Sequence, residues 1–373
     1  MKISEFELER FQSLYEHHVD YNLSESGVHP LKVRDLLGGD VDSFLDTELI
    51  YEQTNGPMPL RERIAALYKG ATAENVLVTN GTIEANFLAT WGLLEQGDEV
   101  VYMLPNYVQI KGLAESWGNA LKPFHLREEN AWQPDLAELE AAVSERTRVI
   151  ALCNPNNPTG VLLSDEGRAG ILAIAERAGA WLLIDEIYRG TEHDGVMIDS
   201  FWGSYDRVIA TAGLSKAYGL PGLRIGWMIA PEPFIEDAWG YKDYTSITAG
   251  TLSYELATRA LEPSMLQKIL GRNRDLVKTN LKALQAWIAE QDGLFSLASP
   301  QAGAMAFVKY HFDIPSLELT DKLHKEKSVL VVPGAHFGLE NFLRVGYGLP
   351  TEDLKAALGR IADSVRELNL KAV

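Results

Sequence analysis

Residues 147–188 read TRVIALCNPNNPTGVLLSDEGRAGILAIAERAGAWLLIDEIY and carry the strongest signal for the fold. The first seven residues form an apolar run with the length of a buried strand, and residues 181–185 form a second one. Between them, residues 164–179 have the apolar spacing of an amphipathic helix, which begins at a serine and ends at a glycine. A helix that joins two continuous apolar strands predicts parallel strands in a sheet with helices on both faces.

The same alternation continues along the chain in both directions. Further strands are predicted at residues 76–79, 99–103, 207–212 and 224–230, and further helices at residues 83–94, 135–143 and 264–293. We therefore expect an α/β fold with two domains. The large domain, residues 46–265, would hold a mostly parallel mixed sheet between helices. A smaller α+β domain would combine residues 1–45 with residues 266–373.

The composition excludes several classes of protein. The chain has 373 residues, of which 46% are hydrophobic and 23% charged, as in an ordinary globular protein. Its 52 acidic and 34 basic residues give a formal net charge of -18, which would repel nucleic acid. The single cysteine, Cys153, allows no disulfide framework, and the eight histidines show no metal-ligand spacing. Because the sequence shows neither a signal peptide nor an apolar run of membrane-spanning length, we expect a cytoplasmic protein without metal or membrane contact.

Chemically unusual residues follow the predicted strands. Ligands of open α/β sheets bind at the carboxyl ends of the strands, so these positions are the first candidates for a site. Asn80-Gly81-Thr82 follows a strand and opens a helix, where it is either an anion site or an ordinary helix N-cap. Residues 154–160, NPNNPTG, combine two prolines, a glycine and three amide side chains in a loop more elaborate than a turn requires.

Three charged residues have both a structural and a functional interpretation. Asp185 ends an apolar strand and is either half of a buried salt bridge or a carboxylate that holds a proton on a ring nitrogen. Lys216 lies in a glycine-rich turn and is either a solvated surface charge or, in a desolvated pocket, a nucleophile toward an aldehyde. Arg344, in the strand-like FLRVG, pairs either with a charge at a domain interface or with a carboxylate or phosphate.

Three motifs together identify a family: NPNNPTG, DEIY at residues 185–188, and LSKAYGLPGLRIGW at residues 214–227. The chain resembles the class I/II aminotransferases, which are fold type I pyridoxal-phosphate enzymes. The resemblance runs from Tyr51 to Arg344, with the motifs in the family's order. It implies a fold type I transferase that binds pyridoxal 5′-phosphate (PLP) and moves the α-amino group of an amino acid to a 2-oxo acid.

The resemblance also implies roles for individual residues. Lys216 matches the lysine that forms the Schiff base with PLP and then moves the proton between the substrate α-carbon and the cofactor. Asp185 matches the carboxylate that keeps the pyridine nitrogen protonated, so that the ring accepts electrons. Tyr188 and Asn157 match the donors to the ring phenolate oxygen. The implied catalytic set is therefore Lys216, Asp185 and Tyr188.

Further matches surround the cofactor and the substrate. The implied phosphate cup consists of Gly81, Thr82, Ser215 and Arg224. Tyr107, in LPNYVQ, matches the aromatic residue that stacks on the ring. Tyr51 matches the tyrosine that reaches the phosphate in the neighbouring subunit, which implies a homodimer with shared active sites. Arg344 matches the residue that binds the substrate α-carboxylate, with Asn157 and Gly27 beside it.

Two departures from the family pattern affect these expectations. Gly213 stands where relatives often have a serine or threonine that binds the phosphate, so that one hydroxyl contact is missing or comes from Ser215 or Thr211. The amino-terminal segment NLSESGVHP, residues 22–30, replaces a common Gly-x-Pro stretch. Glu25 within this segment either meets a basic substrate side chain or is a solvated loop carboxylate, and we expect the second.

The sequence leaves three candidate functions for the chain. The first is a PLP-dependent aminotransferase. The second keeps the cofactor but performs β-elimination or cyclisation, because the amino-terminal segment, LSKAYGLPGLRIGW and VLVVPGAHFG (residues 329–338) are similar to capreomycidine synthase. The third is a ligand-sensing module like the aminotransferase-like half of some transcription regulators. The start of the fold near residue 1 and the net charge of -18 argue against this third function.

Overall fold

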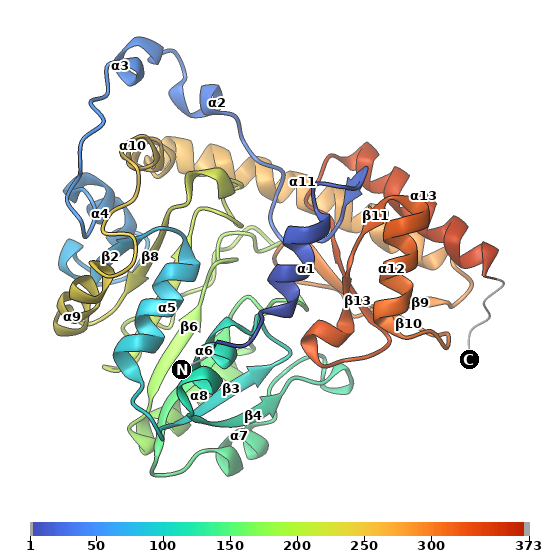
Figure 1. Ribbon diagram of the computed structural model, residues 1–373, viewed down its shortest axis with the longest axis horizontal. Helices are drawn as coiled ribbons and strands as arrows, with labels where there is room; N and C mark the ends of the chain where they lie inside the picture. Colours follow the sequence, from blue (N-terminus) through green and yellow to red (C-terminus); the bar gives the residue numbers. More distant parts are fainter. Residues whose placement is uncertain (1–2, 369–373) are drawn as a thin grey trace.

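The computed structural model describes residues 3–368 (Figure 1). Its largest sheet has seven strands in the order β2–β8–β7–β6–β5–β3–β4. Strand β8 is antiparallel to both of its neighbours, and all other neighbouring strands are parallel. This is the mostly parallel mixed sheet predicted from the sequence. The strands are β2 (Val76–Thr79), β3 (Glu99–Leu104), β4 (Ala120–His125), β5 (Thr147–Cys153), β6 (Trp181–Asp185), β7 (Val208–Gly213) and β8 (Gly226–Ile229).

Helices cover both faces of this sheet. Successive side chains of a strand point to opposite faces. On one face, side chains of β5 and β6 share an apolar core with α8 (Asp165–Ala178). On the other face, the alternate side chains of the same strands share a second core with α5 (Thr82–Leu93) and α9 (Glu232–Lys242). The strands are continuous apolar runs because both of their faces are buried.

The predicted ends of helix α8 are confirmed. The hydroxyl of Ser164 accepts the backbone N–H of Gly167 at 3.1 Å, which caps the start of the helix. At the other end, Gly179 adopts a left-handed conformation with φ of 64°, which glycine tolerates without steric cost. Local chemistry therefore sets both ends of the helix that joins β5 to β6.

Strand β4 is absent from the sequence prediction. It lies at the edge of the sheet, and Phe124 is its single buried residue. Pro123 also interrupts its pattern, because proline has no backbone N–H for a sheet hydrogen bond. An edge strand tolerates a low apolar content and a proline. The segment therefore shows neither the apolar run nor the alternation by which the other strands were predicted.

Both ends of the chain contribute to the remaining structure, at one side of the large sheet (Figure 1). Strand β1 (Tyr21–Asn22) pairs in parallel with β11 (Val329–Leu330). A four-stranded antiparallel sheet has the order β12–β13–β10–β9. Its strands are β9 (Phe295–Leu297), β10 (Met305–Tyr310), β12 (Val332–Pro333) and β13 (Phe342–Gly346). The pairing of β1 with β11 joins the two ends of the chain, whereas Leu36 and Leu37 share an apolar core with Trp227 of the large sheet. The division into residues 46–265 and residues 1–45 with 266–373 remains a proposal.

Helix α1 (Glu7–Tyr15) lies between the large sheet and the carboxyl-terminal elements (Figure 1). The other helices are α2 (Val33–Leu37), α3 (Val41–Leu45), α4 (Met58–Ala65), α6 (Gln109–Trp117), α7 (Leu136–Ala142), α10 (Thr251–Ala260), α11 (Pro263–Ala289), α12 (Ser316–Lys327) and α13 (Thr351–Glu367). Within residues 3–368, no helix combines the length and the apolar character needed to cross a membrane. Helix α1 matters most for function, because it covers the site described next.

Candidate active site

A cavity of about 320 Å³ lies where the strands of the large sheet meet α1 and the carboxyl-terminal sheet. Its wall comes from α1, the segment after β1, the start of α5, the loops after β3, β5 and β6, the turn after β7, and β13. Nine of the residues predicted for the site line this cavity: Thr82, Tyr107, Asn157, Asp185, Tyr188, Ser215, Lys216, Arg224 and Arg344. The fold therefore brings together motifs that are far apart in the sequence.

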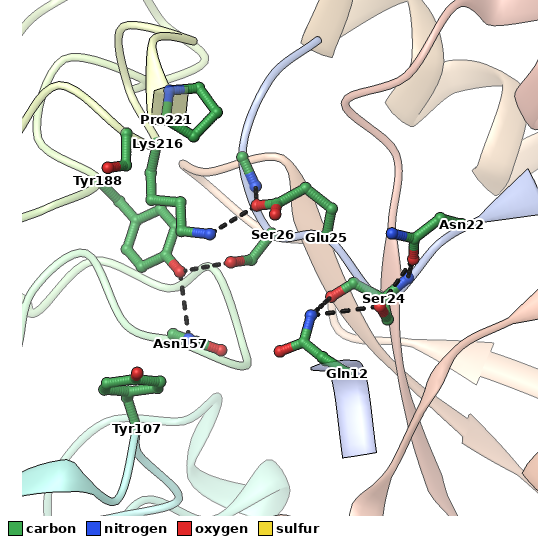
Figure 2. Close-up of polar contacts among 12 residues, drawn as sticks. Gln12, Asn22, Ser24, Glu25, Ser26, Tyr107, Asn157, Tyr188, Lys216 and Pro221 are labelled. Atoms are coloured by element: carbon green, nitrogen blue, oxygen red, sulfur yellow. Dashed lines mark hydrogen bonds and ion pairs between the residues drawn. The ribbon is translucent and has the colours of Figure 1, made fainter. Parts of the chain in front are cut away.

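The amine of Lys216 is directed at Glu25 (Figure 2). Lys216 Nζ donates to Glu25 Oε1 at 2.5 Å, and the same oxygen accepts the N–H of Gly27 at 2.7 Å. Burial alone would raise the pKa of Glu25, but the Lys216 ammonium and the Gly27 N–H outweigh it and lower the pKa. Glu25 is therefore not a carboxylate that water alone solvates, because it is ion-paired although its side chain is 43% exposed, and Lys216 is its partner within the cavity.

Asp185 ends β6 as a buried carboxylate. Burial raises its pKa to about 6. Asn86 donates to its Oδ2 at 3.1 Å and the N–H of Ile187 to its Oδ1 at 3.0 Å. The hydroxyl of Thr211 fixes Asn86 in turn, by donating to its Oδ1 at 2.6 Å. Within the described part of the chain, no lysine, arginine or histidine forms an ion pair with Asp185, so the salt-bridge interpretation does not hold.

A chain of hydrogen bonds connects the loop after β5 to β13. Arg344 donates through Nη1 to Asn157 Oδ1 at 3.0 Å and through Nη2 to the carbonyl oxygen of Ser24 at 2.6 Å. Asn157 donates through Nδ2 to the hydroxyl of Tyr188 at 3.1 Å, and that hydroxyl donates to Ser26 Oγ at 2.8 Å (Figure 2). Burial raises the pKa of Tyr188, which keeps its hydroxyl neutral. Arg344 is only 2% exposed, and its Nε has no hydrogen-bond partner among residues 3–368.

The start of α5 combines several features that bind anions. Gly81 is its N-cap, with φ of 83°, and a Cβ at this position would collide with the guanidinium of Arg224. Thr82 Oγ1 is buried without a hydrogen-bond partner. Arg224 Nη1 also lies 3.4 Å from Ser215 Oγ. A cation, two hydroxyls and a helix amino terminus therefore gather at one end of the cavity, as an anion requires.

The structure gives a physical reason for Gly213. A Cβ at this position would lie 2.5 Å from Thr82 Oγ1 and 2.9 Å from the Cα of Gly226, so no side chain fits there. Thr211 is not free to replace the missing hydroxyl, because it donates to Asn86. Ser215, which lines the cavity, is the remaining candidate.

Three other predicted residues have distinct positions. Tyr107 lines the cavity, and its hydroxyl donates to Glu9 Oε1 at 2.7 Å. Gly27 lies beside the lysine, where a Cβ would approach Lys216 Cδ to 3.2 Å. Tyr51 does not line the cavity and is 83% exposed.

The sequence analysis missed several residues of the cavity. Asn86 lies one helical turn after Thr82, so its spacing was the available signal for a position on the same face of α5. Ser26 and the acidic face of α1 gave no comparable signal, because tertiary packing alone brings them to the site. Among residues 3–368, no group of histidine, cysteine and carboxylate side chains is suited to hold a metal ion.

Comparisons with known proteins identify relatives of this chain. A sequence model of the family described as aminotransferase class I and II matches residues 45–361. The chain is 31% identical to capreomycidine synthase of Streptomyces vinaceus over 92% of this chain and 89% of that protein. It is 29% identical to aspartate aminotransferase of Thermotoga maritima, over 89% and 85%. A crystal structure of a PLP-dependent aminotransferase from Streptococcus suis superposes with a TM-score of 0.93 at 32% identity, and the match covers 98% of this chain and 99% of that one.

Proposed function

The chain belongs to the aminotransferase class I and II family, and from this premise we propose how its residues serve the reaction. The protein is a fold type I, PLP-dependent enzyme that transfers the amino group of an amino acid to a 2-oxo acid. One observation carries the assignment of residues. Lys216, Asp185 and Arg344, each with a chemically distinct task, line the same cavity.

The residues of the cavity fit PLP. A phosphate group would provide acceptors for the partnerless hydroxyl of Thr82 and a counter-charge for Arg224. A protonated pyridine nitrogen would provide the cation that buried Asp185 lacks. When bound, PLP supplies an aldehyde that bonds to amines and a ring that withdraws electrons from the substrate α-carbon.

Lys216 is proposed as the amine that holds the cofactor aldehyde covalently. Once substrate has taken its place, Nζ of Lys216 is free to remove the proton from the substrate α-carbon and later to return one. Its position in a tight turn after β7 and its contact with Glu25 hold the amine inside the cavity.

Asp185, Tyr188 and Asn157 are proposed to set the charge around the ring. Asp185 would keep a proton on the ring nitrogen, while Asn86 keeps its carboxylate in place. Tyr188 and Asn157 would donate hydrogen bonds to the phenolate oxygen, and Tyr107 would pack on the face of the ring. These residues come from three different loops, which the strand ends hold together.

Arg344 is proposed to bind the substrate α-carboxylate. Its guanidinium is buried and already held by Asn157 and Ser24, so binding would cost it little side-chain entropy. A carboxylate would accept hydrogen bonds in the fork geometry that arginine offers. Gly27, beside Lys216, would leave room for the substrate.

A homodimer is proposed from the exposed apolar residues of the segment before α4. Tyr51 is 83% exposed, and Leu45, Leu49 and Ile50 beside it are also exposed. A second copy that covered this segment would bury it and bring Tyr51 to the partner's phosphate site. The cytoplasmic location expected from the sequence likewise remains a proposal, to be checked by cell fractionation.

The test of the function uses the purified protein with PLP. Binding should give a cofactor absorbance band in the visible range, and an amino acid substrate should shift it while its 2-oxo acid accumulates. Absence of any band, or of any shift with a panel of amino acids, would contradict the proposal.

A second function, β-elimination or cyclisation, is favoured by one observation, the 31% identity to capreomycidine synthase. Both functions begin with removal of the α-proton, so the same residues serve either one. Product analysis separates them. Ammonia or a cyclic amino acid, without transfer of nitrogen to a 2-oxo acid, would favour the second function.

A further inference from the structure

The cavity contains more carboxylates than the proposed function uses. Its charged lining residues are four acids and three bases within the described chain: Glu9, Glu16, Glu25, Asp185, Lys216, Arg224 and Arg344. The three bases and Asp185 all have a role toward PLP or the substrate α-carboxylate. Glu9, Glu16 and Glu25 have none, and no further basic side chain lines the cavity to balance them.

Two of these carboxylates come from one face of α1. Leu8, Glu9, Gln12, Ser13 and Glu16 line the cavity, a spacing of three to four residues that places them on one side of the helix. Hydrogen bonds fix this face. Tyr107 donates to Glu9 at 2.7 Å, and Gln12 Nε2 donates to the carbonyl oxygen of Ser24 at 2.9 Å (Figure 2).

The third carboxylate, Glu25, has a cationic partner that the cofactor would also engage. Its close partner is Lys216 Nζ at 2.5 Å. A lysine nitrogen joined to the cofactor aldehyde would keep at most one N–H, so Lys216 would have little capacity left to pair with Glu25. Arg344, the other cation near Glu25, already donates to Asn157 and Ser24. A partly buried carboxylate without a counter-charge is unfavourable, so Glu25 is left with capacity for a cation from the ligand.

An independent observation places the anionic end of the ligand in the same cavity. Arg344 is 2% exposed and lines the cavity, and its Nε is buried without a partner. The cavity therefore offers a buried guanidinium to a carboxylate and three surplus carboxylates to a cation. A dicarboxylic amino acid would need a second basic group for its side chain, and the described residues that one copy of the chain contributes provide none beyond those already assigned.

We propose that the amino-acid substrate carries a cationic side chain, which Glu9, Glu16 and Glu25 bind between α1 and the segment after β1. This inference rests on the proposed transaminase function and names its substrate class. Ammonium and guanidinium side chains share the required chemistry, since both donate charge-assisted hydrogen bonds to carboxylates.

The test compares amino acids that differ in charge but hardly in shape. The PLP-loaded enzyme is mixed with L-arginine or L-citrulline, and with L-lysine or L-norleucine, and the change in cofactor absorbance gives kcat/KM. The cationic member of each pair should be preferred by roughly 10- to 100-fold, as expected for a charge-assisted hydrogen bond. A preference below twofold, or a preference for L-glutamate over both cationic substrates, would overturn the inference.

Variants that remove single charges identify the carboxylates responsible for the preference for cationic substrates. Glu25→Gln and Glu9→Gln should each reduce the ratio of arginine to citrulline by about tenfold. Glu5→Gln removes the same charge from an exposed position that does not line the cavity, so it should leave the ratio unchanged. An unchanged ratio in both cavity variants would overturn the role of these carboxylates. If a variant fails to fold, the comparison of cationic with neutral amino acids on the wild-type enzyme still tests the inference.

Failure of the proposed function has a different signature. In that case no amino acid of any charge would change the cofactor absorbance, and both the proposed function and the inference would be contradicted. A change with neutral and cationic amino acids at equal rates would leave the function standing and remove the inference alone.

Discussion

Asp185 shows how one side chain can weaken the fold and serve the reaction. It is 8% exposed, and burial raises its pKa to about 6 from an ordinary value of 3.8. Its hydrogen bonds with Asn86 and Ile187 hold the carboxylate in place but bring no positive charge. An ionised carboxylate in this environment destabilises the cofactor-free protein, and the protonated ring nitrogen of PLP would relieve that cost.

Asp185→Asn should therefore stabilise the cofactor-free protein near neutral pH. Because the folded-state pKa lies above the unfolded one, the contribution of Asp185 to stability is present below about pH 4 and is lost as pH rises through about 6. The shift corresponds to roughly 3 kcal/mol. Urea unfolding of both PLP-free proteins between pH 4 and 8 measures this, and the stability advantage of the variant over the wild type should grow up to about pH 6 and then level off. A variant that is the less stable protein above pH 6 would contradict the account.

Arg344→Lys should raise KM for the amino acid by roughly 10- to 100-fold, because a lysine keeps the charge but loses the fork that binds a carboxylate. Its effect on kcat should be smaller, since the α-proton is removed elsewhere in the cavity. Steady-state kinetics with one amino acid over a range of concentrations measures both constants. An unchanged KM would show that the α-carboxylate binds another group.

Among the elements, the contact of β7 and β8 with the start of α5 constrains the cofactor site most tightly. A Cβ at Gly226 would collide with the backbone of Gly81 and Thr82, and a Cβ at Gly213 would meet Thr82 Oγ1 at 2.5 Å. Two strands and a helix therefore approach one another at backbone distance. This close approach places Thr82 at the anion end of the cavity and explains why Gly213 has no hydroxyl.

Gly213→Ser should consequently weaken PLP binding, although it adds the hydroxyl that relatives often have. Overpacking at this contact should also lower the free energy of unfolding by roughly 1–3 kcal/mol. Gly271→Ala is the matched control, since a Cβ there meets nothing within 4 Å in helix α11, where alanine is favoured over glycine. Cofactor titration and thermal unfolding of both variants provide the comparison, and tighter PLP binding by the serine variant would refute the steric explanation.

For the molecule as a whole, the exposed segment before α4 argues for a second copy of the chain. Leu45, Leu49 and Tyr51 are each more than two-thirds exposed, at 71%, 78% and 83%. Helices α2 and α3 lie nearby on a segment that extends away from the large sheet (Figure 1). Apolar residues so exposed and so close together are typical of an interface.

Sedimentation of the PLP-loaded protein should therefore give twice the mass of the 373-residue chain. Leu49→Asp should shift the protein toward monomer, because burial of an unpaired carboxylate opposes association. It should also weaken PLP binding if Tyr51 contributes to the partner's site. A wild-type protein that sediments as a monomer at micromolar concentration would contradict the shared active site.

The sequence predicts the fold where burial on both faces leaves a continuous apolar run. The bounds of β2, β5 and β6 agree with the prediction to the residue, whereas the edge strand β4 was not predicted. The motif residues of the site were also predictable, because local turns hold them at strand ends. Glu25 was not, since its environment is set by Lys216, which is 191 residues away along the chain. Long-range pairs of this kind carry no local pattern.

The central claim is that Lys216 forms the covalent bond with PLP. Borohydride reduction of the PLP-loaded protein, followed by trypsin and mass analysis, tests it most directly. The account predicts one phosphopyridoxyl group on Lys216, within a peptide that spans residues 208–224 because the modified lysine resists cleavage. A label on any other lysine, or an unlabelled peptide that is cleaved after Lys216, would contradict the claim.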